Sequence, residues 1–284
     1  MRDSRGQGEK VNTTEIISKM AFLSYSSTFV KSLTIEEPEG DYRTRGVIHL
    51  FLRAETGSVK TTILSEIARN FKVDVVPDIT NAGLVGTIDK NMNVIPGACW
   101  QFRKKILLLD EFSTDGNSSC AQSLLPLLES QSYEKRFGRT ALPNNDKDGD
   151  LYFKVDSGLM SIKTRFACVI ASMKDMHKSR SKIVEALITR CITVRYKLSE
   201  DELEAVLDGK KLMRFDKCGI KKPFDARISL DDYKQIRECV KSYPNIDKNK
   251  AYLRTVGDCC RAFAILGKHD FNTYFLITKL HQEA

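Results

Sequence analysis

The stretch of sequence that decides the fold is residues 47–64, which reads VIHLFLRAETGSVKTTIL. Residues 47–52 form a compact apolar run with the length of a buried strand. A polar turn follows, and from Ile63 to Ala68 apolar residues recur at helical spacing. The order strand, loop, helix predicts the first unit of a parallel α/β sheet.

The polar turn carries the chemistry of a phosphate-binding loop at residues 57–61, Gly-Ser-Val-Lys-Thr. Such a loop turns backbone N–H groups around an anion at a helix N-terminus, with a lysine for the terminal phosphates and a hydroxyl for magnesium. Lys60 and Thr61 fit the last two roles. The full pattern G-x-x-x-x-G-K-[ST] is broken, because Ala54 replaces its first glycine and Val59 precedes the lysine. An ordinary strand-to-helix turn is the alternative interpretation.

A second apolar run of strand length, residues 106–109, ends in Asp110 and Glu111, about fifty residues after Lys60. An aspartate at the end of a buried strand holds the magnesium ion of a bound nucleotide, and a neighbouring glutamate polarises the water that attacks the γ-phosphate. The two motifs occur in the order and at the spacing that such a site requires. The alternative is a core strand that ends in two acids.

Composition limits the class of protein. The 284 residues carry 45 Lys and Arg against 37 Asp and Glu, a formal net charge of +8, and 42% are hydrophobic. These values indicate a globular protein and exclude collagen-like, low-complexity and wholly disordered classes. The basic balance favours an anionic partner, nucleic acid first. No run of about 18 apolar residues occurs and residues 1–10 are polar, so we expect no membrane partner, no secretion and a cytoplasmic location, including a nucleoid-associated one.

Eight cysteines are scattered along the chain without a CxxC pair. In an intracellular chain this pattern indicates reduced core thiols rather than a disulfide framework. A zinc site built from Cys218, Cys239, the pair Cys259-Cys260 and His269 is the alternative.

Along the rest of the chain, strand and helix patterns alternate until about residue 200, and helical patterns follow. This order predicts an N-terminal extension at residues 1–45, an α/β core at 46–200 and a C-terminal helical lid domain at 201–284. The predicted elements are a helix at residues 15–24, strands at 73–76, 106–109, 167–171 and 192–196, a hairpin at 151–166, helices at 121–130, 182–189 and 200–207, two or three helices after 230, and a polar loop at 143–150.

Taken with these motifs, the chain resembles the AAA+ ATPase module of the minichromosome maintenance (MCM) replicative helicases and of related viral and plasmid ATPases. The resemblance rests on residues 57–61, on 82–86 with 96–98, and on 107–112, and it extends over about residues 46–280. It implies an α/β P-loop NTPase fold, with a three-layer αβα core around a parallel sheet and a small helical lid. It also implies an ATPase whose cofactors are ATP and Mg²⁺. The family often has a small alanine where Val59 stands, whereas Ala54 departs from its pattern.

The resemblance also assigns site residues. Lys60 and Glu111 are implied to be catalytic, Thr61 and Asp110 to hold magnesium, and Arg254 to contact the γ-phosphate. Ser172 stands at the sensor 1 position, where the family usually has Asn. The implied nucleotide-binding residues are Glu55, Thr56, Gly57, Ser58, Val59, Lys60, Thr61, Thr62 and Arg254.

Arg190 resembles the family's arginine finger, a residue that stabilises charge on the phosphoryl group of a neighbour's nucleotide. This role implies a homo-oligomer, with a hexameric ring as the expected form. A plain surface arginine is the alternative.

Two hairpins of the family touch DNA, and they correspond here to residues 86–95, with Lys90 near the tip, and 151–164, with Lys154 and Lys163 beside the turn. Basic residues there would contact phosphates in a salt-dependent, sequence-independent way; solvated lysines are the alternative. We therefore expect an ATPase that acts on DNA in replication as a helicase, helicase loader or remodeller. The competing hypotheses are a nucleotide-dependent protein remodeller or switch without DNA contact, and a protein that binds nucleotide without hydrolysing it.

Overall fold

The computed structural model describes residues 12–54, 59–77, 79–112, 119–137, 141–173, 182–244, 246 and 252–283. The helices are α1 (Thr13–Ser27), α2 (Lys60–Phe71), α3 (Asn81–Val85), α4 (Ala98–Gln101), α5 (Ser119–Ser130), α6 (Lys182–Ile188), α7 (Glu200–Leu207), α8 (Leu230–Lys241), α9 (Tyr252–Leu266) and α10 (Phe271–Glu283). The strands are β1 (Val30–Ile35), β2 (Tyr42–Thr44), β3 (Leu50–Ala54), β4 (Val75–Pro77), β5 (Gly86–Ile88), β6 (Val94–Pro96), β7 (Ile106–Asp110), β8 (Ser132–Arg136), β9 (Asn144–Asp148), β10 (Leu151–Asp156), β11 (Leu159–Lys163), β12 (Ala167–Met173), β13 (Ile192–Arg195) and β14 (Phe224–Ile228).

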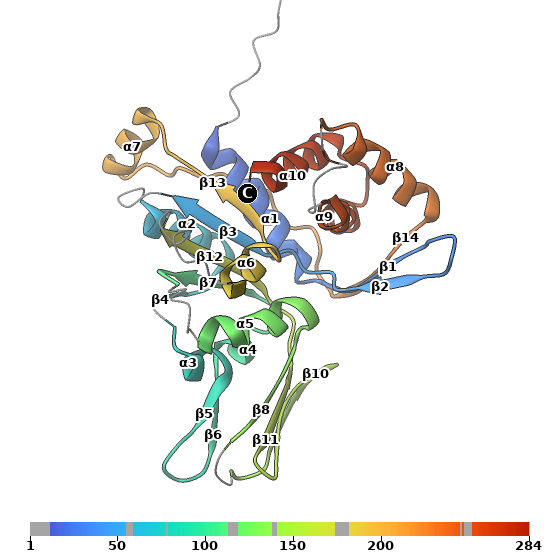
Figure 1. Cartoon of the computed structure of the whole chain (residues 1–284). Coiled ribbons are helices and arrows are strands. Elements are labelled where there is room, and N and C mark those ends of the chain that lie inside the picture. Colours follow the sequence, from blue (N-terminus) through green and yellow to red (C-terminus); the bar gives the residue numbers. More distant parts are fainter. Residues whose placement is uncertain are drawn as a thin grey trace, which may run out of the picture.

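A five-stranded parallel sheet in the order β13-β3-β12-β7-β4 forms the centre of the molecule (Figure 1). Alternate side chains of β7 enter two separate hydrophobic clusters, Ile106 and Leu108 in the first, Leu107 and Leu109 in the second. The first cluster contains residues of α1, α2, α9 and α10, and the second contains residues of α3 and α5. Parallel strands buried on both faces need apolar residues on both faces. The expected α/β class with a parallel sheet is confirmed, and the layering is compatible with a three-layer fold.

Two β structures extend from the body side by side and are called the projection here (Figure 1): the β5–β6 hairpin and an antiparallel sheet in the order β8-β11-β10-β9. Two hydrogen bonds link these structures. The backbone N–H of Leu142, just before β9, donates one of 2.8 Å to the carbonyl oxygen of Met92 between β5 and β6. Trp100 Nε1, in the helix α4 after β6, donates one of 2.7 Å to Asp146 Oδ2 of β9. Both predicted hairpins are confirmed.

The polar loop expected at residues 143–150 was wrong, because residues 144–148 form strand β9. This strand lies at the edge of the sheet and pairs only with β10 among the strands of that sheet. Its side chains are half-buried or exposed, so the sequence shows no apolar face to announce a strand. Polar and charged residues are common on edge strands, because they discourage pairing with other chains.

Residues 12–45 belong to the folded body. Ile17 and Met20 of α1 are fully buried in the first cluster, together with Tyr274 of α10. Strand β1 pairs in parallel with β14, a partner almost 200 residues away (Thr34↔Arg227, Ile35↔Ile228). The division of the chain at residues 45 and 200 stays a prediction, but the N-terminal segment packs against both of the regions that follow it. The expected helices of the C-terminal region are α7 to α10, of which the last three lie together beyond α1 (Figure 1). Among the described residues, the helices are too short or too polar to cross a bilayer.

Candidate functional site

The carboxyl edge of the central sheet is where the topology of the chain reverses. After β3 the chain crosses to the far edge strand β4, whereas after β12, the neighbour of β3, it runs the other way to β13. In open α/β sheets, ligands bind outside the carboxyl ends of the strands at such a switch point. Ala54, Asp110 and Met173 end the strands β3, β7 and β12 at this edge.

Helix α2 begins at this edge with Lys60. Its N-cap residue, Val59, makes no side-chain hydrogen bond to the first turn. The first backbone N–H groups of a helix have no partners within the helix, and they carry the positive end of the helix dipole. This helix end is therefore suited to bind an anion.

Val59 adopts a left-handed backbone conformation, with φ 51° and ψ 34°. For a β-branched residue this conformation is a genuine outlier, and it costs about 1–2 kcal/mol. Glu111 has a similar φ of 50° directly after β7. Strained residues of this kind concentrate at functional sites, and here they lie on both sides of the same edge.

Thr61 and Asp110, 49 residues apart in the sequence, are in direct contact. The Thr61 hydroxyl Oγ1 donates a hydrogen bond of 2.9 Å to Asp110 Oδ2. The other carboxylate oxygen, Oδ1, accepts a hydrogen bond of 3.0 Å from the backbone N–H of Glu111. Asp110 is 6% exposed, whereas Glu111 is exposed. The two residues expected to hold magnesium thus meet at the first turn of α2, and the expected water-orienting glutamate follows directly.

Ser172 lies on the same edge but is buried, in β12 opposite Arg53 of β3. Arg53 is also opposite Arg195 of β13. Burial and the charge of Arg195 lower the pKa of Arg53. These two arginines form a cationic row across the edge that the sequence reasoning missed. The pairing of β13 with β3 brings the two arginines side by side. In the sequence, the only sign of this row was one arginine directly after each of the two apolar runs, at residues 53 and 195.

Thr62 lies in the first turn of α2 and is half-buried. Four of the expected nucleotide-binding residues, Glu55, Thr56, Gly57 and Ser58, lie outside the described residues.

Arg190 and Arg254 lie at the opposite edge of the sheet, in one pocket of about 410 Å³ lined by residues from β2, α5 and α9. Arg190 comes just before β13, whose first residue Ile192 pairs with Leu50, the first residue of β3. A five-residue strand is about 16 Å long, so the two arginines are separated from Asp110 by the length of the sheet. Arg190 Nη1 donates a hydrogen bond of 2.8 Å to Ala186 O, and its Nε lies 2.5 Å from Glu129 Oε2. Arg254 is exposed.

Asp258 organises the inner wall of this pocket. Its Oδ1 accepts a hydrogen bond of 2.7 Å from Arg261 Nη1, and its Oδ2 lies 2.9 Å from His281 Nε2. Burial by itself raises the pKa of Asp258, but the hydrogen bond from His281 and the charges of Arg261 and Arg45 outweigh it and lower the pKa to about 2. Burial and the charge of Arg261 lower the pKa of Arg45 to about 10. The carboxylate therefore stays charged and holds the cations of the pocket in place.

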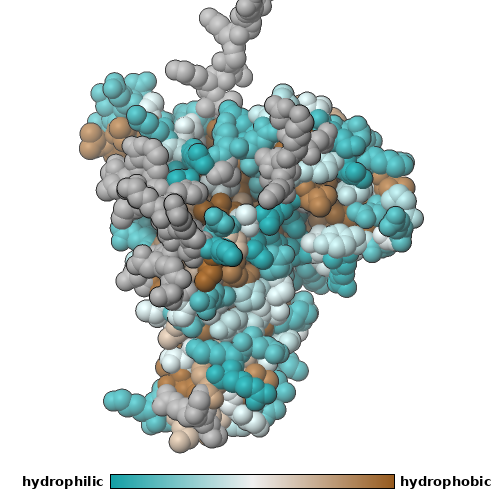
Figure 2. Space-filling view, in the orientation of Figure 1, coloured by the Kyte–Doolittle hydropathy of each residue, from teal (hydrophilic) through white to brown (hydrophobic). Residues whose placement is uncertain are grey.

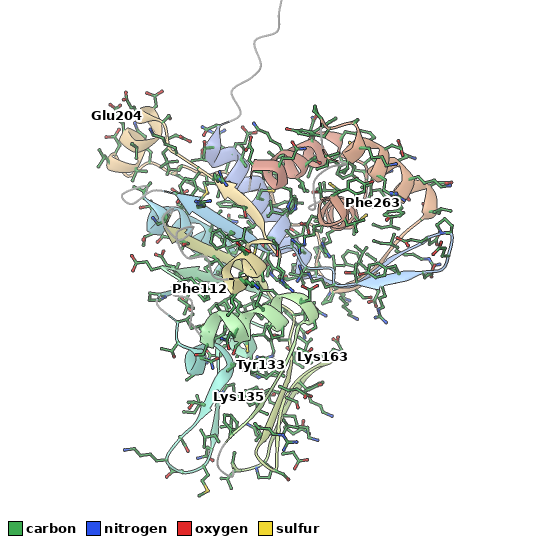
Figure 3. The ribbon with its side chains drawn as sticks, in the orientation of Figure 1. Phe112, Tyr133, Lys135, Lys163, Glu204 and Phe263 are labelled. Carbon is green, nitrogen blue, oxygen red and sulfur yellow. The ribbon has the colours of Figure 1, made fainter. Side chains whose placement is uncertain are left out.

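The three lysines expected to contact DNA all lie on the projection and are exposed. Lys90 is at the tip of the β5–β6 hairpin. Lys154 Nζ lies 3.6 Å from Asp156 Oδ2, and Lys163 Nζ lies 4.0 Å from Asp150 Oδ2. Lys163 is near the root of the projection and Lys135 lies farther out (Figure 3). Two of the three expected contacts therefore have a carboxylate beside them.

The zinc alternative finds no support in the described part of the chain, where no three His, Cys, Asp or Glu side chains gather in a metal-binding group. Six cysteines are buried and two, Cys218 and Cys239, are half-buried.

Comparison of the chain with protein-family models gives no match, and comparison with curated proteins gives none either.

Proposed function

We propose that this protein is an ATPase of the AAA+ class, similar to the ATPase module of the MCM helicases, that binds ATP with Mg²⁺ and acts on DNA. One observation carries the proposal: the 2.9 Å hydrogen bond from Thr61 to Asp110 at the N-terminus of α2. A hydroxyl and a buried carboxylate are hard oxygen donors, which magnesium prefers, and the helix end beside them suits a phosphate. The donor set of this edge therefore fits a magnesium-nucleotide complex.

Each residue at this edge has a role in the proposed reaction. A magnesium ion held here would neutralise negative charge on the phosphates of the nucleotide. Lys60, the first residue of α2, adds a second positive charge there, and the backbone N–H groups of the helix end donate hydrogen bonds to the anion. Thr61 and Asp110 hold the metal ion directly or through water. Glu111, exposed and next to Asp110, orients the attacking water, and Ser172 contributes a polar group on the neighbouring strand.

Arg190 and Arg254 serve the nucleotide of a neighbouring copy in this proposal. The support is their position, because both line the pocket at the amino edge of the sheet, a strand length away from Lys60 and Thr61. The resemblance implied only that Arg254 contacts a γ-phosphate. Its place beside Arg190 favours the same role in trans for both arginines, in a homo-oligomer whose expected form is a hexameric ring.

The projection is the proposed DNA-binding part, because both hairpins extend from the body together and carry exposed lysines. A specific observation favours the second candidate function, a nucleotide-dependent remodeller or switch that does not touch DNA. Carboxylates stand beside Lys154 and Lys163, so little net positive charge remains at these positions to attract a phosphate backbone.

ATP hydrolysis by the purified protein tests the proposal, with and without single- or double-stranded DNA. We expect turnover that DNA stimulates, and its loss in Lys60→Ala. Glu111→Gln is expected to bind ATP and hydrolyse it far more slowly, since only the orientation of water is removed. Normal hydrolysis by Glu111→Gln would contradict the catalytic assignment. Nucleotide binding without turnover would favour the nucleotide-dependent switch. So would a rate of turnover that DNA does not change at low salt.

A further inference from the structure

Helix α7 is only shallowly covered by the described part of the chain: Glu202, Ala205 and Val206 are half-buried. It runs from Glu200 to Leu207, and none of its residues is buried. Figure 1 shows it standing clear of the body at the upper left, on the same side as α2. The helix is nevertheless well formed at its start, where Ser199 and Glu202 make a reciprocal capping box.

One stripe of α7 is apolar. Leu203 and Leu207, four residues apart and therefore on the same face of the helix, are 37% and 87% exposed. Figure 2 shows hydrophobic surface at this helix. The rest of α7 carries Glu200, Asp201, Glu202 and Glu204, and no basic residue. Glu204 lies on the outer part of the helix (Figure 3).

An isolated helix of eight residues is marginal in water, because most helix stability in proteins comes from packing of an apolar face. A capped helix that has no fully buried residue and exposes Leu207 therefore indicates a surface that another molecule covers.

A complementary surface lies at the opposite edge of the sheet. Tyr42 and Leu253, which are 55% and 76% exposed, both line the pocket that contains Arg190 and Arg254. Arg43, next to Tyr42, is also exposed. This surface, here called the Leu253 patch, consists of Tyr42, Arg43, Leu253 and Arg254. It offers two apolar side chains and two cations, where α7 offers two leucines and a set of acids.

The two surfaces of one chain cannot meet. Helix α7 follows the carboxyl end of β13, whereas Arg190 precedes its amino end. Contact between them joins one copy to the next head to tail, and such contacts close into a ring when the rotation permits. The same contact carries Arg190 and Arg254 toward the edge of the next copy that holds Lys60, Thr61 and Asp110.

We infer that α7 is the docking helix of a head-to-tail contact between copies of this chain, with Leu203 and Leu207 of one copy packed on Tyr42 and Leu253 of the next. The inference deepens the proposed function and rests on it, because it supplies the contact that completes the nucleotide site. The acids of α7 lie opposite the arginines of the patch, which orients the approach of the two copies.

Sedimentation velocity of the full chain with ATP and Mg²⁺ tests the contact. Leu207→Gln removes the most exposed apolar side chain of α7 and keeps a good helix former, so the fold is preserved. We expect it to weaken association about tenfold or more, the effect of losing one buried leucine side chain. The matched control is Leu142→Gln, at an apolar residue of the projection that is 49% exposed, and it is expected to associate like the unchanged protein.

Disulfide trapping identifies the surfaces. A mixture of a Leu207→Cys protein and a Leu253→Cys protein is expected to form mixed dimers under mild oxidation, while each protein alone and the unchanged chain form few. Efficient self-linking of the Leu207→Cys protein would point to a two-fold contact between α7 helices and overturn the inference. So would a monomer at every concentration with ATP, or unchanged association in Leu207→Gln.

Binding of a fluorescent ATP analogue, measured on the same samples, separates the two proposals. If Lys60→Ala abolishes nucleotide binding while Leu207→Gln leaves the association of copies unchanged, the docking inference fails and the proposed function stands. If association depends on Leu207 but no nucleotide binds, the docking contact stands and the proposed function fails.

Discussion

At the scale of single residues, the candidate site combines a close polar contact with local strain. The hydroxyl of Thr61 reaches the carboxylate of Asp110 across 49 positions of sequence. Val59, two residues before Thr61, has a φ of 51°, and Glu111, directly after Asp110, has a φ of 50°. Such backbone strain persists only where the surrounding structure imposes it. A substitution that removes the strain should therefore raise the free energy of unfolding.

Val59→Gly is expected to stabilise the protein by about 1 kcal/mol, because glycine adopts the left-handed conformation without the steric cost that valine has there. The measurement is the free energy of unfolding in urea. Val59→Ala is the control, since alanine keeps a Cβ and most of that cost. Equal stabilisation by alanine and glycine would show that the β-branch, and not the left-handed backbone, is the source of the strain.

Asp258 links stability to pH. Its pKa of about 2 in the folded protein lies below its ordinary value of 3.8. A lowered carboxyl pKa contributes stability above the ordinary value, and this contribution is lost as the pH falls through 3.8 toward about 2. We expect about 2 kcal/mol at pH 7, and Asp258→Asn is expected to lose it and to flatten the decline of stability below pH 4.

Urea unfolding between pH 7 and pH 3 measures this effect. Asp231→Asn, at a side chain of α8 that is 88% exposed, is the matched control and should leave the pH profile unchanged. An unaltered acid limb in Asp258→Asn would mean that other carboxylates control stability in this range.

At the scale of elements, the phosphate-site helix is tied to the connection between α7 and β14, residues 208–223, here called the strap. Glu66 of α2 is 6% exposed, and its two oxygens accept hydrogen bonds from Leu212 N (3.0 Å) and Met213 N (2.9 Å). Phe215 of the strap contacts Phe71 of α2 edge to face, at 5.4 Å between ring centroids. The helix that presents Lys60 therefore also holds the chain that leads to the C-terminal helices.

Glu66→Gln is expected to destabilise the protein by about 1–3 kcal/mol, because one strap N–H then faces an amide donor in place of an oxygen. The strap should also loosen, so trypsin is expected to cleave faster after Lys210 and Lys211. Glu204→Gln, on the exposed face of α7, is the control. If both variants resist trypsin equally well, the Glu66 contacts are not what holds the strap.

At the scale of the whole molecule, the first hydrophobic cluster joins regions that the sequence separates. It contains Ile17 of α1, Val169 of β12, and Cys259 and Cys260 of α9, all buried. One cluster shared by the N-terminal helix, the sheet and the C-terminal helices predicts that these parts unfold together.

Thiol labelling across a urea series checks this prediction. Burial raises the pKa of Cys168 in β12 and of Cys259 and Cys260 in α9, so these thiols react only after unfolding. We expect them to lose protection at the same urea concentration, as read by mass spectrometry of the labelled peptides. Labelling of Cys259 and Cys260 at clearly lower urea would indicate that the C-terminal helices unfold as a separate domain.

The sequence by itself determined the parallel sheet, but not the bounds of each strand: the run expected at residues 47–52 is strand β3 at Leu50–Ala54. Apolar runs at residues 106–109 and 167–171 have to be buried on both faces, and hydrophobic periodicity reports burial directly. It also placed Lys60, Thr61 and Asp110 correctly at one edge, because the carboxyl ends of parallel strands meet there. These features depend on local pattern and on one general rule of topology.

Only the tertiary structure decided the rest. The edge strand β9 is polar and none of its side chains is buried, so periodicity gave no sign of it. The pairing of β1 with β14, the row of Arg195 and Arg53, and the meeting of Arg190 with Arg254 in one pocket all join residues distant in sequence. Such contacts are chosen by the packing of the whole chain, and no local pattern of residues encodes which distant partner a side chain meets.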